Sequence, residues 1–120
     1  MNLTSLLAEI IKLLNELYLT IEKNKAKGHQ KEIESAIRNI SALRGEIGIL
    51  SAEASRGMPA KKQKEQVIKI VATLNLFADQ DTENNALTNL ELPEKVIKTL
   101  IVQQAELKRV LDILLQRFGN

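Results

Sequence analysis

The chain has 120 residues and a formal net charge of +2, from 17 Lys and Arg residues against 15 Asp and Glu residues. It contains no cysteine and one histidine, which excludes disulfides, thiolate metal sites, cysteine nucleophiles and clusters of histidine ligands. A hydrophobic content of 44% is too high for a disordered chain, and the length suits a single domain over residues 1–120.

The N-terminal 21 residues are apolar but carry interruptions at Glu9, Lys12, Asn15 and Glu16. A secretory signal starts with basic residues followed by an unbroken apolar run. A membrane span needs about 20 apolar residues with few charges. No segment meets either description, so we expect a cytoplasmic protein that does not associate with membranes.

Glycine and proline residues divide the chain into four helical segments. Gly28 separates the first two, and Gly57 with Pro59 separates the next two. Pro93 suits the first position of the last helix, and Gly119 closes it. The expected helices lie near 2–26, 30–56, 60–78 and 93–118.

Each segment carries apolar residues at alternating steps of three and four, which is the seam of a left-handed helical bundle. Similar lengths and a shared period predict an all-α, antiparallel up-down four-helix bundle, which we expect to be oligomeric. The expected seam consists of Leu3, Leu7, Ile10, Leu14, Leu17 and Ile21; Ile33, Ala36, Ile40, Leu43, Ile47, Leu50 and Ala54; Val67, either Ile70 or Val71, Leu74, Phe77 and Ala78; and Ile97, Leu100, Gln104, Leu107, Leu111, Leu114 and Phe118.

Two features of the last half of the chain leave alternatives open. Gln104, the one polar residue in the last seam, fixes the helix register, is partly exposed, or lines a small polar pocket. Residues 79–92 form a long connection that is either a polar crossover, with Leu87 and Leu90 turned inward, or a functional loop.

Catalytic and metal-binding patterns are missing from the sequence. His29 lies in a connection that contains Lys and Gly, and no phosphate-binding glycine loop is present. The run 79–90 has Asn84 and Leu90 where a calcium loop needs Gly and Glu. We therefore expect a non-enzymatic protein with no catalytic residue, cofactor or metal.

A second set of small and apolar residues lies outside the seam on the second and third helices. Gly45 belongs to it, with Gly48 beside it, and interior glycines cost a helix about 1 kcal/mol each, which indicates a close neighbour. We hypothesise that this set forms a protein interface, the alternative being that the second helix is buried on both sides. The candidate interface residues are Ala42, Gly45, Ile49, Ala52, Ile68, Ala72 and Leu76.

Basic residues gather near the connection between the second and third helices. The antiparallel order places the basic stretch 23–31 beside the acidic stretch 79–91, where charges cancel, whereas the other end has only Glu65 as a counter-charge. Cations at a helix start also oppose the helix dipole, which favours an anionic partner. The candidate patch for that partner is Arg56, Lys61, Lys62 and Lys64.

These patterns predict an interaction protein that binds other proteins through helix faces, as an oligomeric adaptor, assembly factor or small chaperone. Its expected partners are a second copy, with a dimer favoured, or a helical protein. The alternative function is a nucleic-acid-binding accessory protein that uses the basic 56–64 end.

Overall fold

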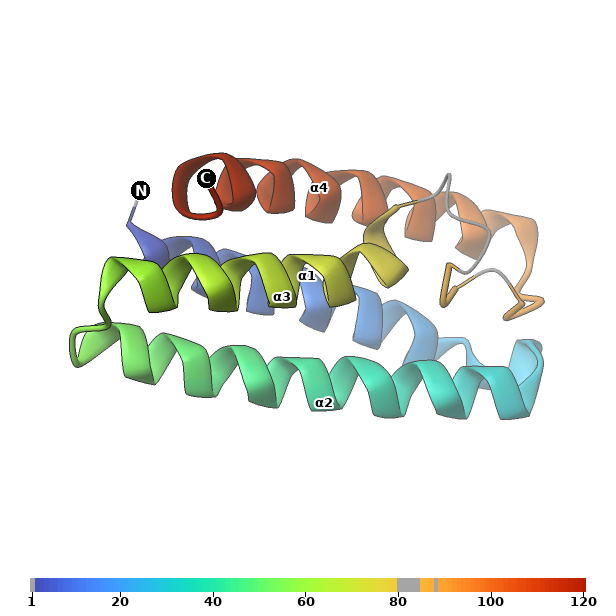
Figure 1. The fold of residues 1–120 in the computed structure, drawn as a ribbon. Coiled ribbons are helices and arrows are strands. Elements are labelled where there is room, and N and C mark those ends of the chain that lie inside the picture. Colours follow the sequence, from blue (N-terminus) through green and yellow to red (C-terminus); the bar gives the residue numbers. More distant parts are fainter. Residues whose placement is uncertain (1, 80–84, 88) are drawn as a thin grey trace.

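The computed structural model describes residues 2–79, 85–87 and 89–120, which form four α-helices and no strand (Figure 1). The predicted all-α class is therefore confirmed, and these helices pack as a bundle. The elements are α1 (Leu3–Lys23), the short 3₁₀ helix η1 (Lys25–Lys27), α2 (Gln30–Ser55), α3 (Ala60–Ala78) and α4 (Glu94–Phe118).

Successive helices run in opposite directions along a body of 45 × 23 × 21 Å (Figure 1). Both termini lie at the same end as the turn between α2 and α3. At the other end, the amide of His29 donates a 2.8 Å hydrogen bond to the carbonyl of Leu90, so the two remaining connections meet as expected. Of the acidic stretch next to them, Asp81 and Glu83 lie outside the described residues.

The first helix ends earlier than the expected residue 26. The amide group of the Asn24 side chain donates to the carbonyl of Thr20 at 2.8 Å, so it takes up a carbonyl at the helix end, and the next residues tighten into η1. At the other helix start, Pro93 is the N-cap residue and Glu94 is the first helical residue, one position later than predicted.

The expected seam is buried at nearly every position. Ala54 and Phe118 are half-buried. The prediction is wrong for Ile97, which is 41% exposed, and it omitted Val110, which is buried. The reason is the length of α3: its last turn lies opposite Gln104, so nothing from α3 covers the first turns of α4. In the long connection, Leu90 is buried and Leu87 half-buried, as expected.

Specific polar contacts join α1 to both of its neighbours. Arg44 of α2 donates a 2.6 Å hydrogen bond to the Asn15 side chain, and its guanidinium lies 4.5 Å from the ring centre of Tyr18. On the opposite side of α1, Gln103 of α4 donates to the hydroxyl of Thr20 at 2.9 Å. These contacts accompany the extensive packing of α1 on α2 and on α4.

Gln104 holds the C-terminal end of α3 on α4. Its side chain is 5% exposed and donates to the backbone carbonyl of Phe77 at 2.7 Å and to the Asn85 side chain at 3.4 Å. Asn85 in turn donates to the carbonyl of Asp79 at 2.7 Å. Helix C-termini have carbonyls without intrahelical donors, so Gln104 belongs to a polar network that satisfies this end of α3.

The aliphatic core predicts large effects of truncation. Leu14→Ala and Leu111→Ala each remove a fully buried side chain, and each should lower the free energy of unfolding by about 2–5 kcal/mol. Leu19→Ala, at a position that is 61% exposed, should change it by less than about 0.5 kcal/mol. Urea denaturation measures all three, and equal values for Leu14→Ala and Leu19→Ala would contradict the core assignment.

The buried amide predicts a different kind of loss. Gln104→Leu keeps the side-chain volume but leaves the carbonyl of Phe77 and the side chain of Asn85 without this donor, which should lower the free energy of unfolding by about 1–3 kcal/mol. Gln116→Leu, at an exposed position of the same helix, is the control. If Gln104→Leu were as stable as the parent protein in urea denaturation, the network would have no role in stability.

Candidate functional site

All seven candidate interface residues are exposed in the single chain. Ile49 is 64% exposed and Leu76 is 41% exposed, which is high for large aliphatic side chains. The alternative that the second helix is buried on both sides is wrong for this chain, because α2 packs extensively on α1 alone. The outer face of α2 is therefore available to a partner.

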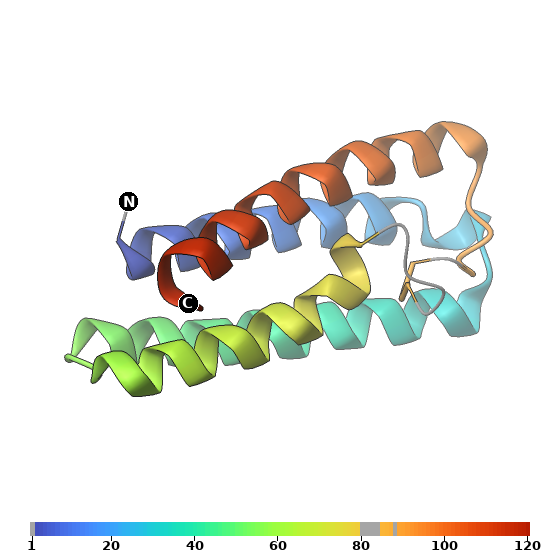
Figure 2. The ribbon, with the colours of Figure 1, turned by 45° about the horizontal axis from the view of Figure 1, so that its top comes forward.

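The seam between α2 and α3 is the open side of the bundle. These helices touch at few points, whereas α1 packs closely on α2 and on α4, and α3 packs closely on α4. Figures 1 and 2 show α3 beside α2 at the 56–59 turn and diverging from it toward Ala78. The bundle is thus well packed along three of its four seams.

Two hollows of about 250 and 310 Å³ lie along this seam. They share Glu46 and Thr73, so they form one continuous groove, which we call the α2–α3 groove. It follows α2 from residue 39 to residue 53, about 21 Å at 1.5 Å per residue. Its lining residues are Asn39, Ala42, Leu43, Glu46, Ile49, Leu50 and Glu53 of α2, Gln66, Lys69, Ile70, Thr73, Leu76 and Phe77 of α3, and Ala86.

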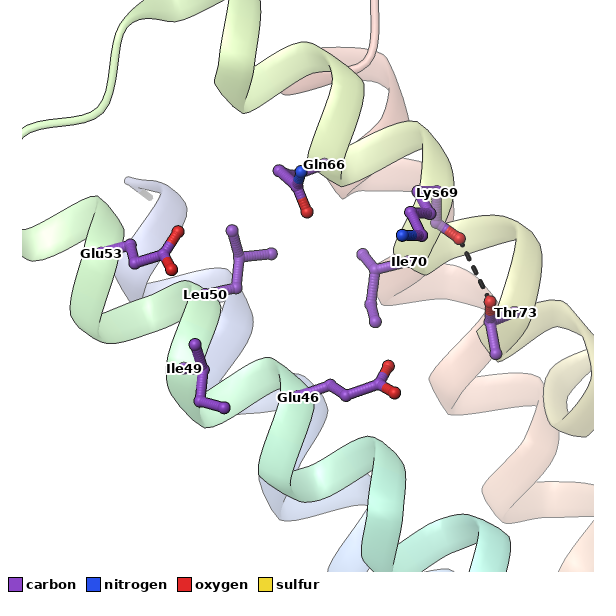
Figure 3. Close-up of a pocket in the computed structure, with 8 residues that line it drawn as sticks. All are labelled: Glu46, Ile49, Leu50, Glu53, Gln66, Lys69, Ile70 and Thr73. Atoms are coloured by element: carbon purple, nitrogen blue, oxygen red, sulfur yellow. Dashed lines mark hydrogen bonds between the residues drawn. The ribbon is translucent and has the colours of Figure 1, made fainter.

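The floor of the groove is apolar. Leu50 and Ile70 extend from opposite helices into the space between them (Figure 3), and both are buried at the base of the groove. Leu43 and Phe77 continue this floor toward the C-terminal end of α3. The exposed side chain of Ile49 stands above this floor. The groove therefore presents apolar surface from its base to its edge.

The two edges of the groove carry opposite charges. Glu46 and Glu53 lie on the α2 edge, seven residues apart, and Lys69 lies on the α3 edge, seven residues after Lys62. Near the turn, the Lys62 ammonium is 3.9 Å from the Glu53 carboxylate. Glu46 and Lys69 line the same hollow, and neither forms an ion pair with any described residue.

The structure gathers only part of the predicted interface into this groove. Ala42, Ile49 and Leu76 line it, whereas Gly45, Ala52, Ile68 and Ala72 are exposed outside its lining. Helix geometry explains the separation of Ile68 from Leu76, because eight residues turn a helix about 80° beyond two full turns. The two side chains therefore point in different directions from α3.

The edge charges were missed as parts of a site. In the sequence, Glu46 and Glu53 are a carboxylate pair on one helix face, a pattern typical of solvated surface, and Lys69 belongs to a general basic stretch. The available signal was a pair of carboxylates seven residues apart, Glu46 and Glu53, followed on the next antiparallel helix by a pair of lysines seven residues apart, Lys62 and Lys69. Glu46 lies across the groove from Lys69, just as Glu53 lies across from Lys62 one pair nearer the turn.

Two of the four basic residues in the candidate anionic-partner patch line a hollow near the turn. All four are exposed, but only Arg56 and Lys62 line the small hollow at the 56–59 turn, and they share it with Glu53. Lys61 and Lys64 line none of the hollows described here. The candidate anionic-partner patch therefore contains a carboxylate that the sequence order did not reveal.

The described residues contain no cluster of three or more metal-ligating His, Asp or Glu side chains. His29 is exposed, and its Nδ1 lies 3.9 Å from a Glu32 carboxylate oxygen on the same helix start. Within the same ranges, no helix combines the length and the apolar character that a membrane span requires.

Comparison with known proteins finds no matching family model, no similar curated protein and no similar solved structure. The fold and the α2–α3 groove define the chain as a four-helix bundle with one open, apolar and charge-edged seam. Because a bundle fold is compatible with many functions, function is inferred from this groove.

Two exposed glycines on α2 give a prediction about this surface. A methyl group added at Gly45 or at Gly48 would meet nothing within 4 Å outside its own helix turn. Gly45→Ala and Gly48→Ala should therefore each raise the free energy of unfolding by about 0.5–1 kcal/mol, measured by urea denaturation of dilute protein. A loss of stability would show that the single chain itself needs glycine there.

Proposed function

We propose that this chain is a non-enzymatic interaction protein that binds an amphipathic helix of another protein chain along its α2–α3 groove. Recognition of this kind places the apolar face of a helix in a hydrophobic groove, with anchors at steps of three and four residues. A groove of about 21 Å accommodates about 14 helical residues, or four turns. We further propose that it acts in the cytoplasm, as an adaptor, assembly factor or small chaperone.

The open seam is the observation that carries this proposal. A four-helix bundle ordinarily buries all four of its seams, whereas here α2 and α3 leave an apolar floor beside two exposed aliphatic side chains, Ile49 and Leu76. Full burial of such a side chain contributes about 1.5–3 kcal/mol. A helical partner would thus gain affinity from aliphatic surface that stays exposed in the single chain.

The groove also has the polar edges that a protein interface uses. Charged residues at the rim steer association and fix register more than they add affinity, and the groove has acidic residues on one edge and basic residues on the other. The nucleic-acid alternative stays a prediction. Binding that weakens steeply with salt, and that a triple Lys→Glu variant of residues 61, 62 and 64 abolishes, would support it.

Site-specific photo-cross-linking in cells tests the proposed groove. A photoreactive side chain at Ile49 should form covalent adducts with a protein chain, because it stands on the groove edge. Adding Leu76→Glu, which places a charge at the far part of the same groove, should reduce adduct yield by about tenfold or more. Denaturing gels and mass spectrometry measure the yield and identify the adduct.

The same photoreactive side chain at Leu19 or Val102 is the matched control, because these residues are about as exposed as Ile49 but lie on α1 and α4. These positions should give few adducts, and Leu76→Glu should not change them. Equal yields at residues 49 and 19, or no adduct at residue 49, would contradict the proposed function.

A further inference from the structure

We propose that the occupant of the α2–α3 groove is a second copy of this chain, in a dimer whose twofold axis runs along the groove. This inference rests on the proposed function and names the partner for the same site. In the dimer, α2 of each copy lies against α3 of the other, and the four helices enclose an intermolecular core. Ile49 and Leu76 of both copies then become buried.

The edge charges select this arrangement. A twofold axis that lies in an interface can run along the helices or across them. Rotation about an axis parallel to the helices does not change the position of a residue along the helix direction, and it places α2 of one copy over α3 of the other. Glu46 therefore faces Lys69 of the second copy, and Glu53 faces Lys62 of the second copy. The groove is therefore complementary to itself in charge.

An axis across the helices gives the opposite result. It places α2 of one copy over α2 of the other, so Glu46 and Glu53 face the Glu46 and Glu53 carboxylates of the second copy. It also places the basic edge of α3 against the basic edge of the second α3. Like charges facing each other across an interface are unfavourable. The observed charges thus disfavour this dimer.

The size of the face suits a stable dimer. The molecule measures 45 × 23 × 21 Å, so one long side has an area similar to the roughly 800 Å² that each partner buries in a standard interface. A small residue of α2, Ala42, lines the groove and leaves room for a close approach of the second copy. The size of this face, the charges on its edges and the small residue on α2 all suit a second copy of this chain as the partner.

Charge reversal with rescue tests the arrangement on the purified full chain. Sedimentation equilibrium up to about 100 μM, which would populate a dimer of micromolar Kd, should give twice the monomer mass for the parent protein. Glu46→Lys and Lys69→Glu should each weaken the dimer by about tenfold or more, because the twofold axis repeats every substitution. The double variant, and an equimolar mixture of the two single variants, should restore it.

Glu65→Lys on α3 and Lys95→Glu on α4 are the matched controls, since they change the net charge equally at exposed positions that do not line the groove. Both should dimerise like the parent protein. Circular dichroism checks that every variant is folded, as expected for the exposed Glu46 and Lys69.

A parent protein that stays monomeric over this range overturns the inference. Single variants that dissociate without rescue by the double variant also overturn it, because α2 would then not lie over α3. The cross-link at Ile49 separates this failure from failure of the proposed function. If the only adduct is with a different protein, the groove is a binding site but the dimer is wrong. If the adduct yield does not exceed that of the Leu19 control, both the dimer and the proposed function are wrong.

Discussion

The hydrogen bond from the Gln104 side chain to the carbonyl of Phe77 holds the end of α3 against α4. The start of α3 is held beside α2 by the short 56–59 turn and by the proximity of Lys62 to Glu53. A helix that is fixed to one neighbour at its start and to another at its end must diverge from the first. The open seam between α2 and α3 follows from these two attachments.

The open seam gives the bundle two kinds of apolar surface. Residues such as Leu14 and Leu111 lose their contact with water when the single chain folds, so they stabilise the fold. Ile49 and Leu76 stay exposed, so their burial is available to an association instead. Opposite charges on the two edges then make the proposed association specific, because they disfavour a partner placed in the wrong register. Stability and the proposed recognition thus depend on different residues of the bundle.

The fold was largely predictable because the spacing of apolar residues along each helix indicates which face of that helix is buried. The three-four spacing placed α1, α2 and α3 correctly on the core, and it failed at Ile97, where the neighbouring helix α3 is too short to cover α4. The end of α1 was missed for a local reason, the side-chain hydrogen bond of Asn24. The seven candidate interface residues are exposed, which agrees with their predicted position outside the seam. Their separation into Ile49 and Leu76 on one surface and Ile68 on another depends on where the adjacent helix lies.

The sequence by itself determined the helical class, the approximate helix ends and most of the core, because periodicity and turn residues act over a few positions along the chain. Only the tertiary structure decided which seam stays open and which charges face each other across it. Glu53 and Lys62 are nine positions apart on different helices, and their proximity depends on the turn between them. Gln104 and Phe77 meet from separate parts of the chain, and their hydrogen bond joins the end of α3 to α4. Such contacts depend on how whole helices are placed in space, which local spacing does not encode.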